Sequence, residues 1–351
     1  MTPILELRNV SKVFGGGFLS RNRTVAVDDV SFSIASDAPT MTAVAGESGS
    51  GKTTLSRLLL GVTTPSAGQV LYKGEVLATL KGARRRQFLL DVQPIYQDPF
   101  GVFNPFYRAD HLLFAAVDKF KLANSAREGR RLIEEALETV GLRANEILGR
   151  FPHQLSGGQR QRVMIARALL PKPRVILADE PVSMVDASLR ATILESLRAL
   201  NRDFGISILY VTHDLTTAYQ ICNNIIVMYR GSVVEAGTVE EVIRSPKHPY
   251  TQLLIDSIPR MTTVRNWERE DEEGVVDGVG HTRHSAGCKF ADRCPAVMEN
   301  CWAQPPSLYR TSENRIARCF LYADQPVFAE ADVAATFARP QSSSTPQAVK
   351  G

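Results

Sequence analysis

The chain has 351 residues, a length typical of about two domains, and its 44% apolar and 22% charged residues resemble an ordinary globular protein. A formal net charge of +4, spread along the chain, is too weak to indicate nucleic acid binding by itself. No run approaches about 18 consecutive apolar residues, and the start MTPILELRNV lacks a signal-peptide pattern, so we expect a cytoplasmic protein without a transmembrane helix.

Strands dominate the first part of the chain. Alternating or β-branched apolar residues predict strands at 4–7 and 25–34, and a short strand at 42–45 leads into the glycine-rich loop GESGSGKTT. A helix through residue 60 follows this loop. From about 99 to 155 the apolar residues recur at helical spacing, as in AREGRRLIEEALETVGL.

Helices and apolar strands then alternate. RVILADE and ISILYVTHD are expected to be strands, RQRVMIARALL and SLRATILESLRALNRDF helices, and IIVMYRGSVVEAG a β-hairpin that turns at Arg230 and Gly231. This alternation predicts an α/β fold with a largely parallel sheet covered on both faces, into which the helical block at about 99–165 is inserted as a subdomain.

The glycine-rich loop is the first motif that specifies chemistry. It matches the phosphate-binding pattern G-x-x-x-x-G-K-[ST] at every fixed position. Backbone N–H groups of such a loop and the following helix N-terminus meet the charge of phosphate oxygens, so we expect Lys52 to reach the β- and γ-phosphates and Thr53 to ligate Mg²⁺. The expected nucleotide-binding residues of the loop are Gly46, Glu47, Ser48, Gly49, Ser50, Gly51, Lys52, Thr53 and Thr54.

Two consecutive carboxylates end the buried strand VILADE. Asp179 is placed to hold the Mg²⁺ shell, usually through water. Glu180 follows where a general base or water-polarising carboxylate is needed.

At LSGGQ, residues 155–159, the chain resembles the nucleotide-binding subunits of ABC transporters. The other family motifs are present in order: the phosphate loop, Gln97 in IYQDP, VILADE, a D-loop with Asp186, and His213 in VTHD. The resemblance implies a P-loop NTPase (RecA-like) core with an antiparallel β subdomain and the inserted helical subdomain. It also implies ATP and Mg²⁺ as ligands, and ATP hydrolysis.

The resemblance further implies a role for each matched residue. Two ATPase subunits of this family sandwich ATP, so the signature residues Ser156, Gly157, Gly158 and Gln159 would face a nucleotide held mainly by the partner. The implied catalytic residues are Glu180, His213 and Gln97, and the implied Mg²⁺ contacts come from Thr53, Gln97 and Asp179. Adenine would stack on Phe14 in SKVFGG, with Phe18 as the alternative. The D-loop departs from the common pattern at Met184 and Val185.

The last part of the chain resembles the oligopeptide/dipeptide importer ATPases. HPYTQLL begins at His248, and CKFADRCP begins a set of four cysteines, Cys288, Cys294, Cys301 and Cys319. This likeness implies import of peptides, with oligosaccharides, nickel or opine-like compounds as other cargoes. The implied partners are a second, non-identical ATPase subunit, two transmembrane permease subunits and, indirectly, an extracytoplasmic solute-binding protein, with the chain at the cytoplasmic face of the membrane and no nucleic acid bound.

The four cysteines are separated by five, six and seventeen residues. Structural zinc sites more often have pairs two to four residues apart, whereas a [4Fe–4S] cluster tolerates wider loops. We therefore expect a cluster, and zinc or a metal-free thiol or disulfide module remains open. His281 and His284 lie nearby in the sequence and are expected in a solvated linker.

These patterns divide the chain into four parts. We expect an ABC ATPase domain at 1–260, a linker at 261–285, a four-cysteine module at 286–325 and a disordered tail at 326–351. A soluble ABC ATPase acting on nucleic acid is the first alternative function. Single occurrence of the ATPase motifs and the absence of a long coiled-coil insertion both disfavour it. An exporter subunit and a non-enzymatic binding module are further alternatives.

Overall fold

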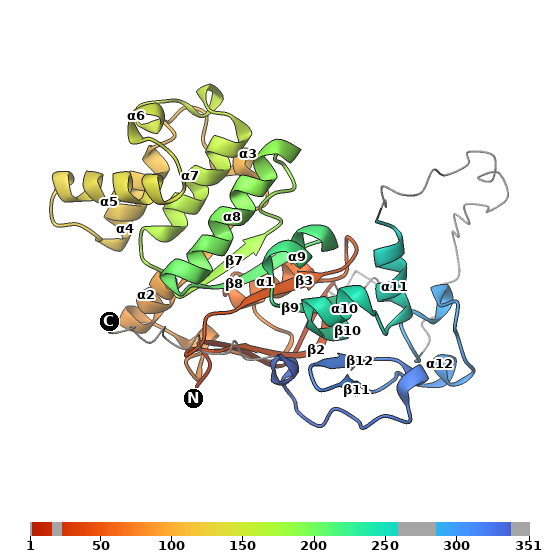
Figure 1. The fold of residues 1–351 in the computed structure, drawn as a ribbon. Coiled ribbons are helices and arrows are strands. Elements are labelled where there is room, and N and C mark those ends of the chain that lie inside the picture. The colour runs from red at the N-terminus through yellow and green to blue at the C-terminus, as the bar shows by residue number, and fades with distance from the viewer. Residues whose placement is uncertain (1, 16–22, 259–285, 338–351) are drawn as a thin grey trace, which may run out of the picture.

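The computed structural model describes residues 2–15, 23–258 and 286–337 of the chain (Figure 1). Two sheets frame the molecule, one of eight strands and one of four. Within the described ranges, no helix has both the length and the apolar character needed to cross a membrane.

The larger sheet lies at the centre of the molecule. Its strands are β3 (Met41–Ala45), β6 (Val92–Ile95), β7 (Val175–Asp179), β8 (Ser207–Thr212), β9 (Asn224–Tyr229), β10 (Ser232–Thr238), β11 (Tyr309–Ser312) and β12 (Arg315–Ala317). They are arranged in the order β11-β12-β10-β9-β3-β8-β7-β6. The strands from β9 to β6 pair in parallel, and β10, β12 and β11 extend the sheet with antiparallel pairs.

Apolar side chains cover both faces of this sheet. On β7, Ile176 joins the apolar cluster that includes the inserted helices, whereas its neighbour Leu177 joins the cluster beneath the smaller sheet. On β8, Ile208 and Leu209 divide in the same way. Burial on both faces explains the continuous apolar runs of these strands and confirms the expected parallel core.

The smaller sheet is antiparallel. It contains β1 (Leu5–Phe14), β2 (Thr24–Ile34), β4 (Ala67–Tyr72) and β5 (Glu75–Val76), in the order β2-β1-β4-β5. β1 is longer than the strand expected at 4–7. Its pairing with β2 and β4 shifts register around Asn9, whose φ is +46°, so the polar–apolar alternation breaks although the strand continues.

Helices pack on the two faces of the large sheet. The first part of the chain contributes α1 (Lys52–Leu59), η1 (Leu77–Thr79) and α2 (Gly82–Asp91). The inserted subdomain contains α3 (Pro99–Val102), α4 (His111–Phe120), α5 (Ala126–Thr139), α6 (Ala144–Ile147), η2 (Pro152–Gln154) and the start of α7 (Gly157–Leu169). The helices that follow are α8 (Ala187–Phe204), α9 (Leu215–Ile221), α10 (Val239–Arg244) and α11 (Pro249–Asp256). In Figure 1 the inserted helices form a lobe set apart from the strands.

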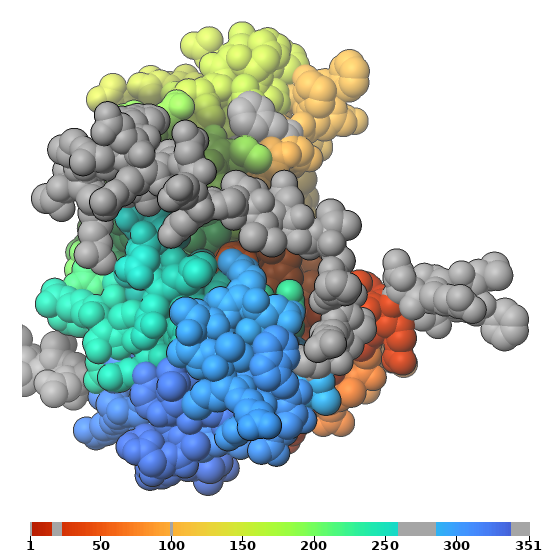
Figure 2. Space-filling model, turned by 90° about the vertical axis from the view of Figure 1, so that its right-hand side faces the viewer, coloured from red at the N-terminus to blue at the C-terminus, as the bar shows by residue number. Residues whose placement is uncertain are grey.

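The four-cysteine region, which we expected to be a separate module, adds two strands to the main sheet. It contains η4 (Ala291–Arg293), α12 (Asn300–Ala303), β11, β12 and η5 (Phe320–Tyr322). β12 pairs with β10, with Ile316 opposite Ala236. Figure 2 shows this C-terminal segment packed against the region of α10 and α11. Pairing of strands far apart in the sequence leaves no local signal, which is why the sequence suggested an independent unit.

The tail expected to be disordered from residue 326 is ordered as far as residue 337. Val333 and Thr336 are buried in η6 (Val333–Thr336), and the Phe337 ring lies 6.3 Å from that of Phe32 in β2. Asp332 accepts a hydrogen bond of 3.1 Å from the backbone N–H of Ser33. A few spaced apolar side chains thus anchor residues 326–337, whereas most polar residues of the tail follow only after them. The expected linker at 261–285 and the end of the tail lie outside the described residues.

Candidate functional site

The phosphate loop follows β3 and packs against β2 of the smaller sheet and against the turn between β9 and β10. Gly51 has φ +107°, and a Cβ at this position would lie 2.1 Å from the carbonyl oxygen of Ala26, so only glycine fits. Ser50 accepts a 2.9 Å hydrogen bond at its carbonyl from the N–H of Gly231, in the turn between β9 and β10. The turn predicted at Arg230 and Gly231 is therefore confirmed, and it also supports the loop.

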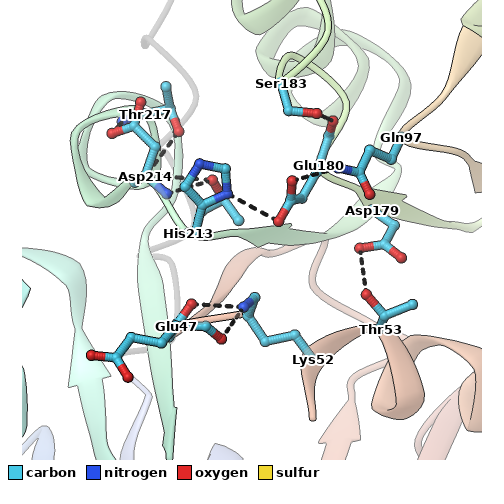
Figure 3. Close-up of polar contacts among 12 residues, drawn as sticks. Glu47, Lys52, Thr53, Gln97, Asp179, Glu180, Ser183, His213, Asp214 and Thr217 are labelled. Atoms are coloured by element: carbon cyan, nitrogen blue, oxygen red, sulfur yellow. Dashed lines mark hydrogen bonds and ion pairs between the residues drawn. The ribbon is translucent and has the colours of Figure 1, made fainter. Parts of the chain in front are cut away.

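Lys52 lies inside the loop at the start of α1. Its Nζ donates to the carbonyl oxygens of Gly46, at 2.6 Å, and Glu47, at 2.8 Å, and the side chain is buried (Figure 3). Burial lowers its pKa, while Glu180 and Asp179 oppose this change. The ammonium group thus occupies the concave side of the loop, the position from which it can reach phosphate oxygens.

Thr53 and Asp179 form a pair of oxygen donors beside Lys52. The hydroxyl of Thr53 donates to Oδ1 of Asp179 at 3.4 Å. Burial raises the pKa of Asp179, and the neighbouring carboxylate of Glu180 adds to that increase. A hydroxyl and a carboxylate next to a phosphate loop are hard oxygen ligands of the kind Mg²⁺ prefers, so these residues fit the expected ion.

Glu180 contacts the other two residues expected to be catalytic, His213 and Gln97. Its Oε1 lies 3.0 Å from Nδ1 of His213, and its Oε2 accepts a 2.8 Å hydrogen bond from Nε2 of Gln97 (Figure 3). The three residues follow β7, β8 and β6, whose carboxyl ends share one edge of the parallel sheet. Glu180 has φ +44°, an uncommon conformation for this residue type that clusters at functional sites.

The signature residues begin α7 in the inserted subdomain. Ser156 accepts at Oγ from the N–H of Gln159, and the side chain of Gln159 accepts from the N–H of Ser156. This reciprocal cap fixes the helix start. A Cβ on Gly158 would lie 2.6 Å from Cδ1 of Leu189, so this glycine permits close packing against α8.

The D-loop runs from Ser183 to Asp186, directly before α8. Val185 is buried and Met184 is 54% exposed. The hydroxyl of Ser183 donates to the backbone carbonyl of Glu180 at 3.0 Å, which connects the D-loop to the residue that carries the candidate catalytic carboxylate. The unusual Val185 therefore serves the core, and Asp186 takes the first position ahead of α8.

Phe14 ends β1 with its ring 45% exposed, as an adenine-stacking ring requires. Nζ of Lys12 lies 5.1 Å from the ring centroid. The alternative residue, Phe18, lies outside the described residues.

Two residues in the HPYTQLL and CKFADRCP segments contact the phosphate loop, and neither contact was expected from the sequence. The hydroxyl of Tyr250, in α11, accepts a 2.8 Å hydrogen bond from the N–H of Glu47. Arg293, in η4, donates through both terminal nitrogens to the Glu47 carboxylate, each at 2.9 Å. The HPYT resemblance pointed to the region of Tyr250, but nothing local links either residue to the loop.

The four C-terminal cysteines lie in one region but do not form a metal site in the described residues. All are free thiols, and no group of three or more His, Cys, Asp or Glu side chains in the described part of the chain is placed to bind a metal. The N–H of Cys288 donates to the carbonyl of Cys301 at 2.7 Å. Burial raises the pKa of Cys288 and Cys294, and that of Cys319 to about 11. The described residues therefore show no preformed site for the expected cluster.

Two protein families match the sequence. Residues 27–183 match the family described as ABC transporter, and residues 234–301 match the oligopeptide/dipeptide transporter C-terminal region. The dipeptide transport ATP-binding protein DppF of Haemophilus influenzae is 36% identical, over 91% of this chain and 97% of its own length. A putative peptide import ATP-binding protein of Brucella ovis is 35% identical, over 91% and 98%. The putative oligopeptide transport ATP-binding protein YkfD of Bacillus subtilis is 36% identical, over 91% and 96%.

Solved structures also resemble the chain. A dimeric ATP-binding cassette, MJ0796, in a post-hydrolysis state with ADP and phosphate aligns with a TM-score of 0.58 and 28% identity, over 67% of this chain and 98% of that one. The protein cbiO1 of Clostridium perfringens, part of an ABC transporter complex, aligns with a TM-score of 0.59 and 25% identity, over 70% and 92%.

Proposed function

This chain belongs to the family of peptide-import ATP-binding subunits of ABC transporters, and we propose that it hydrolyses ATP to drive peptide uptake through a membrane permease. The observation that carries the proposal is the arrangement of Glu180 between Gln97 and His213, next to a complete phosphate loop. A binding module without catalysis has no need for this arrangement.

The residues around the phosphates have separate roles in the proposed reaction. The hydroxyl of Thr53 and the carboxylate of Asp179 would hold Mg²⁺, with Gln97 as a third ligand, and the ion would neutralise charge on the β- and γ-phosphates. Lys52 meets the negative charge of the same phosphates. Glu180 accepts the proton of the attacking water, and His213 holds the Glu180 carboxylate in position and contacts the γ-phosphate.

The proposed site is complete only when two ATPase subunits meet. Ser156, Gly157, Gly158 and Gln159 start α7, whereas the phosphate loop follows β3, so the two sets lie on different subdomains. The N–H groups of Gly157 and Gly158 at that helix start suit the γ-phosphate of a nucleotide held by a partner. The likeness to a dimeric cassette supports this arrangement. We propose a non-identical ATPase subunit as the partner, with Asp186 near the shared interface.

The membrane context follows from the same family. We propose two transmembrane permease subunits as partners, a solute-binding protein on the far side, and attachment of this chain to the cytoplasmic face. The names of the relatives favour peptides as the cargo. Oligosaccharides and opine-like compounds remain the alternative cargoes for the same motor.

An iron–sulfur cluster on Cys288, Cys294, Cys301 and Cys319 is a further proposal. What supports it is the presence of four thiols in one region, each of which could serve as a thiolate ligand. Iron and sulfide analysis of protein purified without oxygen tests it, and a colourless preparation without iron would remove it. No step of ATP hydrolysis depends on this group.

The experiment that tests the proposed function measures ATPase activity of the chain reconstituted with its permease and solute-binding protein. Peptide-loaded binding protein should stimulate hydrolysis several-fold more than binding protein offered an oligosaccharide. Stimulation by oligosaccharide alone would transfer the proposal to the alternative cargo. Hydrolysis stimulated by nucleic acid and indifferent to the permease would refute it.

A further inference from the structure

The first variable residue of the phosphate loop is held by the C-terminal part of the chain. Glu47 donates its backbone N–H to the hydroxyl of Tyr250, and its carboxylate accepts two hydrogen bonds of 2.9 Å from Arg293. Figure 3 shows the Glu47 side chain pointing away from Lys52, and the carboxylate binds Arg293 instead. Glu47 and Arg293 are 246 positions apart in the sequence.

The same short segment also reaches the other end of the loop. Nζ of Lys289 forms a 2.6 Å ion pair with Asp28 and donates to the carbonyl of Arg230 at 2.9 Å. That residue begins the turn whose Gly231 N–H donates to Ser50 of the loop. Residues 289–293 thus contact the loop directly at Glu47 and, through the turn, at Ser50.

A packed aromatic cluster fixes the position of Arg293. Its guanidinium lies 5.7 Å from the ring centroid of Phe290 and 5.9 Å from that of Tyr229. The rings of Tyr229, Tyr250 and Phe290 contact one another at centroid distances of 4.5 to 5.5 Å. Phe290 and Tyr250 are almost fully buried. Packing against these rings restricts the Arg293 side chain, so it loses less conformational entropy when it forms its two hydrogen bonds to Glu47.

We propose that Arg293 is a positioning residue for nucleotide binding, which acts by fixing Glu47 and the start of the phosphate loop. Two physical effects support this role. A loop rich in glycine loses much conformational entropy on ordering, so holding it in advance lowers the cost of binding phosphate. Arg293 also neutralises a carboxylate that would otherwise repel the anionic nucleotide. The inference rests on the proposed ATPase function and adds the C-terminal region to its nucleotide site.

Binding of a fluorescent ATP analogue to the full-length chain tests this proposal. R293Q should weaken binding about fivefold, because a bidentate pair with both side chains more than a third exposed is worth about 1 kcal/mol. R310Q is the matched control. It removes another C-terminal arginine pair, with Glu330 at 3.1 Å, that makes no contact with the loop, and it should leave the affinity unchanged.

A double-mutant cycle separates positioning from general damage. If Arg293 acts through Glu47, R293Q should change the affinity less than twofold when E47Q is already present. Equal losses in the E47Q and wild-type backgrounds, or equal effects of R293Q and R310Q, would overturn the proposal. If R293Q does not fold, R293K tests the same bidentate pair, and Y250F tests the second contact that holds Glu47; both should weaken binding. A wild-type chain that binds no nucleotide would refute the proposed ATPase function. Wild-type affinity in R293Q, R293K and Y250F would refute only the positioning role of Arg293.

Discussion

Two regions of this molecule differ in how they build the proposed nucleotide site. From β3 to β8, the expected functional residues lie in short motifs that follow parallel strands, as with Asp179 and Glu180 at the end of β7. From β10 to residue 337, the contacts join residues far apart, such as Arg293 with Glu47 and Asp332 with Ser33. The functional residues of the first region can therefore be recognised from short sequence motifs. The contacts by which the second region supports the phosphate loop form only in the folded chain.

The C-terminal region has its own buried polar centre. Glu235 of β10 is fully buried and accepts hydrogen bonds of 2.9 Å from the N–H groups of Lys247 and His248, just ahead of α11. His248 in turn accepts from the N–H of Tyr250, the residue whose hydroxyl contacts the phosphate loop. Hydrogen bonds through the start of α11 thus connect Glu235 with the phosphate loop. Substitutions in this region should lower the free energy of unfolding more than the rate of ATP hydrolysis.

The largest effect is expected at Glu180, in the motif region. E180Q should lower the rate of ATP hydrolysis about 10²- to 10⁴-fold, because an amide cannot accept the proton of the attacking water. Binding of ATP should be retained, since Lys52 and the phosphate loop are unchanged. Phosphate release and fluorescent nucleotide binding measure the two quantities. An E180Q protein with the wild-type hydrolysis rate would remove Glu180 from its assigned role.

The next effect concerns His248 and appears only in acid. Burial lowers its pKa from 6.5 to about 4, so the unfolded chain binds a proton first as the pH falls. Stability should be fully present above about pH 6.5 and decline by on the order of 3 kcal/mol towards pH 4.

H248N separates this titration from the other acidic groups. Asparagine can still accept from the N–H of Tyr250 but does not titrate, so the variant should lack that part of the decline. Glu235, whose pKa burial raises, is present in both proteins and cancels in the comparison. Denaturant unfolding at several pH values gives the slopes, and identical slopes for the two proteins would contradict the assignment.

A smaller effect is expected at Phe14, the residue proposed to stack on adenine. F14A should weaken ATP binding by about 1–3 kcal/mol, the usual value of stacking between an aromatic side chain and a base. Inorganic triphosphate has no base, so its binding should not change. Loss of both affinities in parallel would show that Phe14 supports the fold of β1 and does not contact the base.

The smallest effect tests the ordered end of the C-terminal region. D332A removes hydrogen bonds to Ser33 and to the N–H of Ala334 at the start of η6, and should lower the free energy of unfolding by about 1 kcal/mol. D324A, an exposed aspartate nearby, is the control and should change little. Equal stability of D332A and the wild type would show that the Asp332 hydrogen bonds do not stabilise the fold.

The sequence predicted the motif region well because each motif is a local pattern. Strand, loop and helix occur consecutively around Lys52, and the carboxyl ends of parallel strands meet at one edge, so Gln97, Glu180 and His213 were expected together. The long β1 was missed because a bulge at Asn9 breaks its alternation. Strand pairing between β10 and β12 and the Arg293 contact were missed because long-range contacts leave no trace in local periodicity.

ATP hydrolysis by this chain is proposed to drive peptide uptake. Proteoliposomes that contain the permease subunits, both ATPase subunits and a peptide-loaded binding protein provide the direct measurement, as uptake of labelled peptide on addition of ATP. The wild-type chain should support uptake, and E180Q should give none above background although it binds ATP. Uptake at the same rate with E180Q, or ATP hydrolysis by the wild type without any uptake, would contradict this role of the chain.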